Sequence, residues 1–94
     1  MKRKEYLSKC LSDLQKIYYI PNVCIRFGKL KSNCGEAIWH DNGIKEIIIN
    51  NNIKSRPELL ETAVHEYAHF VSNTVKHNSS WGKAYAKLWK GLMD

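Results

Sequence analysis

Residues 55–72 read SRPELLETAVHEYAHFVS, and this stretch decides how the rest of the 94-residue chain is interpreted. Its apolar residues recur at spacings of three and four, which predicts a largely buried helix. Its first four residues supply a capping serine, a proline suited to the first turn and a glutamate that completes a capping box. His65 and His69 lie four residues apart, so both imidazoles project from one face of the helix. We expect this helix to run to about Thr74.

The five residues from His65 to His69 form an H-E-x-x-H pattern. Glu66 follows His65 directly, which places its carboxylate within reach of a water molecule held by the two imidazoles. The plain alternative is a helix with two partly exposed histidines and a solvated glutamate. The apolar flanks argue against that alternative, because burying these polar groups without partners would be costly. A metal ion with a bound water satisfies all three, so the pattern predicts a hydrolytic zinc (Zn2+) site with Glu66 as the catalytic base.

A catalytic zinc ion normally takes three protein ligands and leaves a fourth position for water. After His69 the chain contains no glutamate and no cysteine, only His77 and the terminal Asp94 as further candidates. A helix that ends near Thr74 and is followed by a turn would bring His77 back toward the metal. We therefore predict His77 as the third ligand and keep Asp94 as the alternative. His40 is expected to be a surface turn residue.

The remaining sequence predicts an α+β fold. Apolar spacing indicates a helix at the N-terminus, short β-branched and aromatic runs indicate three strands, and a cap at Asn78 indicates a last helix. The expected elements are a helix over 3–19, strands over 23–27, 35–39 and 45–50, the motif helix, and a C-terminal helix with Trp81 on its apolar face. This order favours a single domain over residues 1–94 with a small, mainly antiparallel sheet.

The net charge of +6 comes entirely from the N-terminal third of the chain. Residues 1–34 carry eight lysines or arginines against two acidic residues, whereas the rest is balanced at seven against seven. This distribution is compatible with an ordinary solvated surface. It also permits binding of DNA or another polyanion, although no nucleic-acid-binding motif accompanies it.

The three cysteines are an odd number without C-x-x-C spacing, which argues against a disulfide framework. Cys10 and Cys24 are expected to be small buried apolar residues, and Cys34 to lie exposed in a turn. No apolar run approaches the length of a membrane span, and no secretion signal is recognisable at the N-terminus. A cytoplasmic location and no membrane partner are the resulting expectations.

The chain resembles the SprT-like zinc metalloproteases and related minimal gluzincin-type peptidases over about residues 35–90. The resemblance rests on Gly35-x-Ala37-x-Trp39, on the H-E-x-x-H helix, and on His77-x-x-x-Trp81. It implies a zincin-like fold in which His65, His69 and His77 bind zinc and Glu66 is the catalytic base. Asn78 stands where that family usually has a glycine.

The resemblance further implies that an extended protein or peptide substrate pairs with an edge strand, here 35–39 or 45–50. Tyr67 and Tyr85 are the phenols near the motif that could stabilise a transition state, although each is more often a packing residue. The leading hypothesis is a zinc-dependent metallopeptidase. The alternatives are a metal-dependent hydrolase of a non-peptide amide, and a non-catalytic module that zinc stabilises, which would have no need of Glu66.

Overall fold

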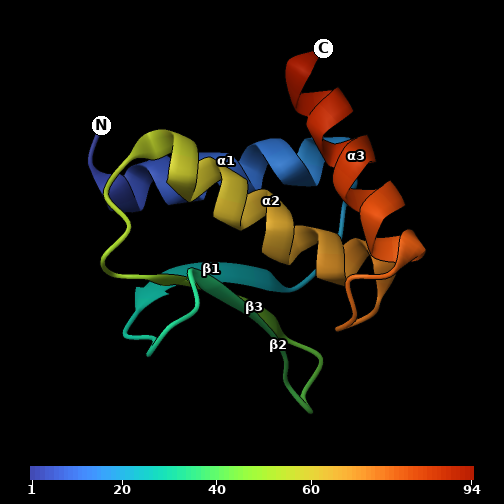
Figure 1. The fold of residues 1–94 in the computed structure, drawn as a ribbon, viewed down its shortest axis with the longest axis horizontal. Helices are drawn as coiled ribbons and strands as arrows, with labels where there is room; N and C mark the ends of the chain where they lie inside the picture. The colour runs from blue at the N-terminus through green and yellow to red at the C-terminus, as the bar shows by residue number, and fades with distance from the viewer.

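The computed structural model describes residues 1–94 as three helices and a three-stranded sheet (Figure 1). The chain order is α1 (Arg3–Ile17), β1 (Val23–Gly28), β2 (Gly35–Trp39), β3 (Lys45–Asn50), α2 (Arg56–Ser72) and α3 (Ser79–Met93). The expected α+β class, with one helix before the sheet and two after it, is confirmed.

The sheet is mixed, with the strand order β1-β3-β2. β3 pairs parallel with β1 and antiparallel with β2, so one of the two pairings departs from the expected antiparallel arrangement. Burial explains the order, because Ile47, Ile48, Ile49 and Asn50 are all buried in β3. The most apolar strand therefore occupies the centre, and β1 and β2 form the two edges.

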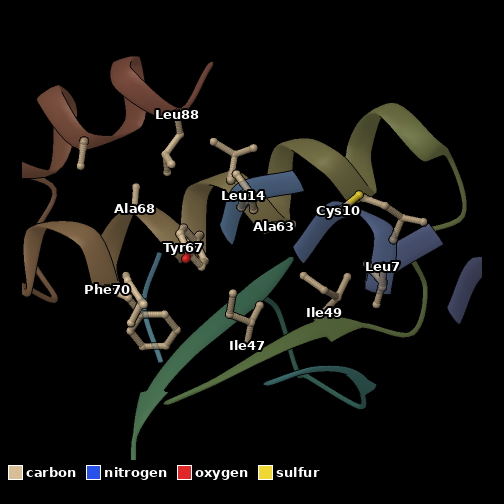
Figure 2. Packing of buried hydrophobic residues seen from close by; sticks show 14 of the residues in the cluster. Leu7, Cys10, Leu14, Ile47, Ile49, Ala63, Tyr67, Ala68, Phe70 and Leu88 are labelled. Carbon is tan, nitrogen blue, oxygen red and sulfur yellow. The ribbon is translucent and has the colours of Figure 1, made fainter. Parts of the chain in front are cut away.

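All three helices lie on one face of the sheet (Figure 1). α1 packs against β1, whereas α2 packs against both β2 and β3 and also contacts α1 and α3. Ile47 and Ile49 point from β3 into the layer of helices, where they meet Ala63 and Tyr67 of α2 (Figure 2). α2 is thus packed against four other elements, which fixes the helix that carries the H-E-x-x-H pattern.

None of the helices is long and apolar enough to cross a membrane.

The predicted helix caps are present. The Ser55 hydroxyl accepts a hydrogen bond from the Glu58 amide at 3.3 Å, which satisfies a free N–H group of the first turn of α2. Asn78 caps α3 in the same way and accepts from the Trp81 amide at 3.1 Å. Asn78 therefore has a structural role in this chain.

Candidate metal centre

A sharp turn after α2 brings the third histidine to the other two. Asn73 ends the helix in the left-handed conformation (φ 54°, ψ 44°), which asparagine tolerates better than most residues. The next residue, Thr74, donates its amide hydrogen to the His69 carbonyl at 3.1 Å. The chain then reverses, and the Nε2 atom of His77 lies 2.9 Å from the Nε2 atom of His65.

The three histidines His65, His69 and His77 form one cluster, as the sequence predicted. One ring nitrogen from each lies within 4.8 Å of the corresponding nitrogens of the other two. In a tetrahedral zinc site with bonds of about 2.0–2.1 Å, neighbouring ligand nitrogens are about 3.3 Å apart. The nitrogens of His65 and His77 are 2.9 Å apart, and all the nitrogens of the cluster lie within 4.8 Å of one another. These distances lie on either side of the expected value, so the three imidazoles fit a metal ion of zinc's size. His40 and Asp94 are not part of the cluster.

The orientation of His69 is fixed by a contact outside the cluster. Its Nδ1 atom lies 2.8 Å from the carbonyl oxygen of Thr74. A carbonyl can only accept, so Nδ1 carries the hydrogen and the lone pair remains on Nε2. Such a partner behind a metal-binding histidine selects the tautomer and holds the ring in place. Sequence patterns give no sign of this contact, because the Thr74 side chain does not take part in it.

Trp81 ties α3 to the same cluster. Its indole N–H donates to the His65 carbonyl at 3.2 Å, and its ring centroid lies 4.8 Å from those of both His65 and His77. The indole thereby covers one side of the imidazoles and restrains the backbone of the first histidine. This contact gives a physical reason for the tryptophan four residues after His77.

The electrostatic setting favours the neutral form of His65 and His69. Burial lowers the pKa of His65 below its ordinary value, and the neighbouring His77 and His69 lower it further. Burial also lowers the pKa of His69, partly opposed by the Thr74 carbonyl, which stabilises the charged ring. Neutral imidazole is the form that binds metal ions, so the lowered pKa values of His65 and His69 favour metal binding by these two residues.

Glu66 lies beside the cluster with its carboxylate almost enclosed. The residue is 7% exposed, and its Oε2 atom is 3.9 Å from the Nε2 atom of His65. No hydrogen bond reaches the carboxylate. Burial, together with the charge of nearby Glu36, raises the pKa of Glu66 to about 7. A group whose pKa is near the working pH can both accept and return a proton.

The cluster and Glu66 line a cleft of about 480 Å³ between α2, the turn that follows it, and β2. The other lining residues are Asn33, Cys34, Gly35, Glu36, Ala37, Trp39, Glu61, Thr62 and Val75. Asn50 holds the loop before β2 in place, since its side-chain amide donates to the Leu30 and Asn33 carbonyls at 3.1 and 2.9 Å.

Gly35 sets the width of the cleft at the start of β2. A Cβ atom at this position would lie 2.6 Å from the Thr62 Cγ2 atom and 3.1 Å from the Glu66 Cγ atom. Only a residue without a side chain allows the strand to approach α2 so closely. The sequence pattern included this glycine, but the reason for it appears only in the packing.

The free edge of the sheet beside the cleft belongs to β2. Of the two candidate strands, β3 is excluded because both of its edges are paired within the sheet. The amide of Asn50 donates to the Cys34 carbonyl, and that of His40 donates to the Ile44 carbonyl. Backbone groups alternate along an antiparallel strand, so the N–H and C=O groups of Gly35, Ala37 and Trp39 point outward.

The two candidate phenols lie differently. Tyr67 is fully buried, and its hydroxyl donates toward the Gln15 side chain (2.9 Å) and the Tyr18 carbonyl (2.7 Å), in the contact between α1 and α2. It does not line the cleft and is a packing residue. Tyr85 stacks on Trp81 with a centroid distance of 4.9 Å, and its ring centroid lies 6.4 Å from that of His65.

The remaining sequence expectations have mixed outcomes. All three cysteines are free; Cys10 is buried and Cys34 is exposed as expected, but the prediction of a buried Cys24 is wrong. Its side chain is on the sheet face that no helix covers. Among the basic residues, Arg3 binds the carbonyls of Asn51 and Ile53, and Arg26 pairs with Glu46, so neither is free. Binding of DNA or another polyanion stays a prediction.

Comparison by sequence found no protein family and no curated protein that matches the chain. Comparison of structures found a match to the crystal structure of the metallopeptidase zymogen of Pyrococcus abyssi abylysin, with a TM-score of 0.72 and 24% sequence identity. The match covers 86% of this chain and 77% of that chain. At this level of identity the likeness shows a shared fold. A specific relation to the SprT-like proteases stays a prediction.

Proposed function

We propose that this chain is a zinc-dependent peptidase. The observation that carries the proposal is the cluster of three histidines with Glu66 enclosed next to it, at the floor of a cleft that borders a free strand edge. The shared fold with a metallopeptidase zymogen supports the same activity. The chemistry of the donor set, three imidazoles, suits zinc among the common metal ions.

A zinc ion bound by the three histidines would supply a Lewis acid, which polarises the scissile carbonyl and lowers the pKa of water. Glu66 takes a proton from the attacking water, whose oxygen then forms a bond to the carbonyl carbon. The carbon–nitrogen bond breaks as Glu66 returns that proton to the leaving amine. The free backbone groups of β2 hold the substrate backbone extended along the cleft.

A structural role for zinc is the principal alternative, and two features disfavour it. Structural zinc sites usually close with a fourth protein ligand, and the cluster contains only three candidate ligands. A structural site also has no use for an enclosed carboxylate without a hydrogen bond. Hydrolysis of a non-peptide amide would use the same site, but the open edge of β2 favours a peptide backbone.

A cytoplasmic location is also part of the proposal, because the chain has three free thiols.

The deciding experiment compares the zinc-loaded protein with its Glu66→Gln variant on a mixture of unstructured peptides, with products identified by mass spectrometry. Both proteins should hold one zinc ion per chain by elemental analysis, because Glu66 is not a ligand. The parent should cleave peptide bonds, and the variant should be slower by roughly 10²- to 10⁴-fold. Equal rates would exclude Glu66 as the base. Stoichiometric zinc without any cleavage by the parent would favour the structural alternative.

A further inference from the structure

The cleft has a charge opposite to that of the protein. The chain carries 15 lysines and arginines against nine acidic residues, yet none of the 15 lines the cleft. Three of the nine carboxylates do line it: Glu36, Glu61 and Glu66. A strongly basic protein thus presents a local concentration of negative charge at the site where a substrate would lie.

The carboxylates of Glu36 and Glu61 have no positively charged partner in the protein. Arg26 pairs with Glu46, and Lys9 pairs with Asp13, but neither Glu36 nor Glu61 takes part in an ion pair. Both side chains are exposed, so solvation alone could explain them individually. They come from two different elements, β2 and α2, and both border the same cleft.

Glu66 is an independent sign that the cleft receives a ligand. Its relative exposure is 7%, it accepts no hydrogen bond from the protein, and it lines the cleft together with Glu36 and Glu61. No donor of the protein reaches its carboxylate, so only water or a ligand in the cleft can hydrogen-bond to it. A ligand there would also lie close to Glu36 and Glu61, which border the same cleft.

We propose that the substrate is a peptide segment with lysine or arginine close to the cleaved bond, and that Glu36 and Glu61 bind these basic side chains. The inference rests on the proposed peptidase function and adds a substrate class to it. Glu36 belongs to the edge strand itself, and its register opposite Ile48 turns its side chain to the sheet face away from α2. Successive side chains of an extended peptide along β2 project to opposite faces, so one can meet Glu36 and the next can meet Glu61 of α2. Peptides with acidic residues at the same positions are repelled.

The test uses three labelled peptides of one sequence that differ only at two central positions, which are lysine, glutamine or glutamate. The parent should cleave the lysine peptide with a kcat/KM roughly tenfold above that of the glutamine peptide, because each exposed ion pair contributes a small factor. The preference should fall as salt is added. A double variant, Glu36→Gln with Glu61→Gln, should lose the preference while still cleaving the glutamine peptide.

The matched control removes two carboxylates elsewhere on the surface, by Glu5→Gln with Asp41→Asn, and should keep the preference. Equal cleavage of all three peptides by the parent would overturn the inference and leave the peptidase function intact. A double variant that loses activity equally on all three peptides would also overturn it.

Binding gives a readout that does not need cleavage. Fluorescence anisotropy of the three peptides with zinc-loaded Glu66→Gln protein should show the lysine peptide bound about tenfold more tightly than the glutamine peptide. Adding Glu36→Gln and Glu61→Gln in that background should remove the difference. If the zinc-loaded Glu66→Gln protein bound the lysine and glutamine peptides with equal affinity, the inference would be refuted, whether or not the parent hydrolyses any peptide. The binding test can therefore fail independently of the proposed peptidase function.

Discussion

Replacing Glu66 by glutamine should stabilise the metal-free protein. Burial holds the pKa of this carboxyl at about 7, against an ordinary value of 4.5. Because the folded-state pKa is the higher one, the neutral acid favours folding below pH 4.5, and this contribution is lost as the pH rises to 7 and beyond. At about 1.4 kcal/mol for each pKa unit, the charged form costs the folded state about 3 kcal/mol at pH 8.

Glutamine has the same size but never ionises. The Glu66→Gln variant should therefore exceed the parent by about 3 kcal/mol in free energy of unfolding at pH 8, and the difference should disappear near pH 4.5. The assay is urea unfolding followed by tryptophan fluorescence, with EDTA present, at several pH values. The lowered pKa values of His65 and His69 affect both proteins alike and cancel in the comparison.

Two further measurements identify the cause. Glu61→Gln removes an exposed carboxylate five residues earlier on α2 and should change the free energy of unfolding at pH 8 by less than about 0.5 kcal/mol, as surface substitutions usually do. Saturating zinc should reduce the advantage of Glu66→Gln, because a nearby cation stabilises the carboxylate. A parent as stable as the variant at pH 8 without metal, or a difference that does not change with pH, would refute the reasoning.

The remaining predictions concern the ligand set and the packing behind it. His77→Ala should weaken zinc binding at least tenfold in a competition titration with a chelator, whereas His40→Ala should not; equal affinities would mean that the ligand set is wrong. Gly35→Ala should lower the free energy of unfolding, measured by calorimetry, by about 1–3 kcal/mol and should slow cleavage, because the new methyl group pushes β2 away from α2. The control is Gly82→Ala, which adds a methyl group in open space on α3 and should leave the stability unchanged or raise it. Tyr67→Phe should cost about 1–2 kcal/mol in the same measurement and leave kcat unchanged; a large loss of kcat at unchanged stability would return this phenol to the catalytic site.

The motif helix and its histidines were predictable because local rules control them. Apolar spacing, a capping box and the H-E-x-x-H pattern all act within one helix, and the i,i+4 geometry of His65 and His69 follows from helix dimensions alone. His77 was reached by a different argument, since few metal ligands remain after His69. The backbone turn at Asn73 that delivers it could not be predicted, because a left-handed asparagine leaves only a weak signal in a single sequence.

The order of the strands depends on competition between segments rather than on any one of them. Three short strands can form a mainly antiparallel sheet or a mixed one with similar local patterns. β3 takes the centre because it has the longest buried run, and this choice makes β1 its parallel partner and leaves β2 as the edge beside α2. The consequence for function is direct: the two strands proposed for substrate pairing reduce to one.

The same long-range packing decides which polar groups become functional. Tyr67 and Glu66 are neighbours in the sequence, and both are almost fully buried. The Tyr67 hydroxyl points toward α1, where two oxygen acceptors satisfy it, whereas the Glu66 carboxylate faces the cleft without a donor. A nearly enclosed carboxylate without a donor from the protein costs stability when it is charged, so it persists where a ligand or a reaction uses it. This contrast between adjacent residues, invisible in the sequence, is the strongest structural reason to assign the chemistry of the cleft to Glu66.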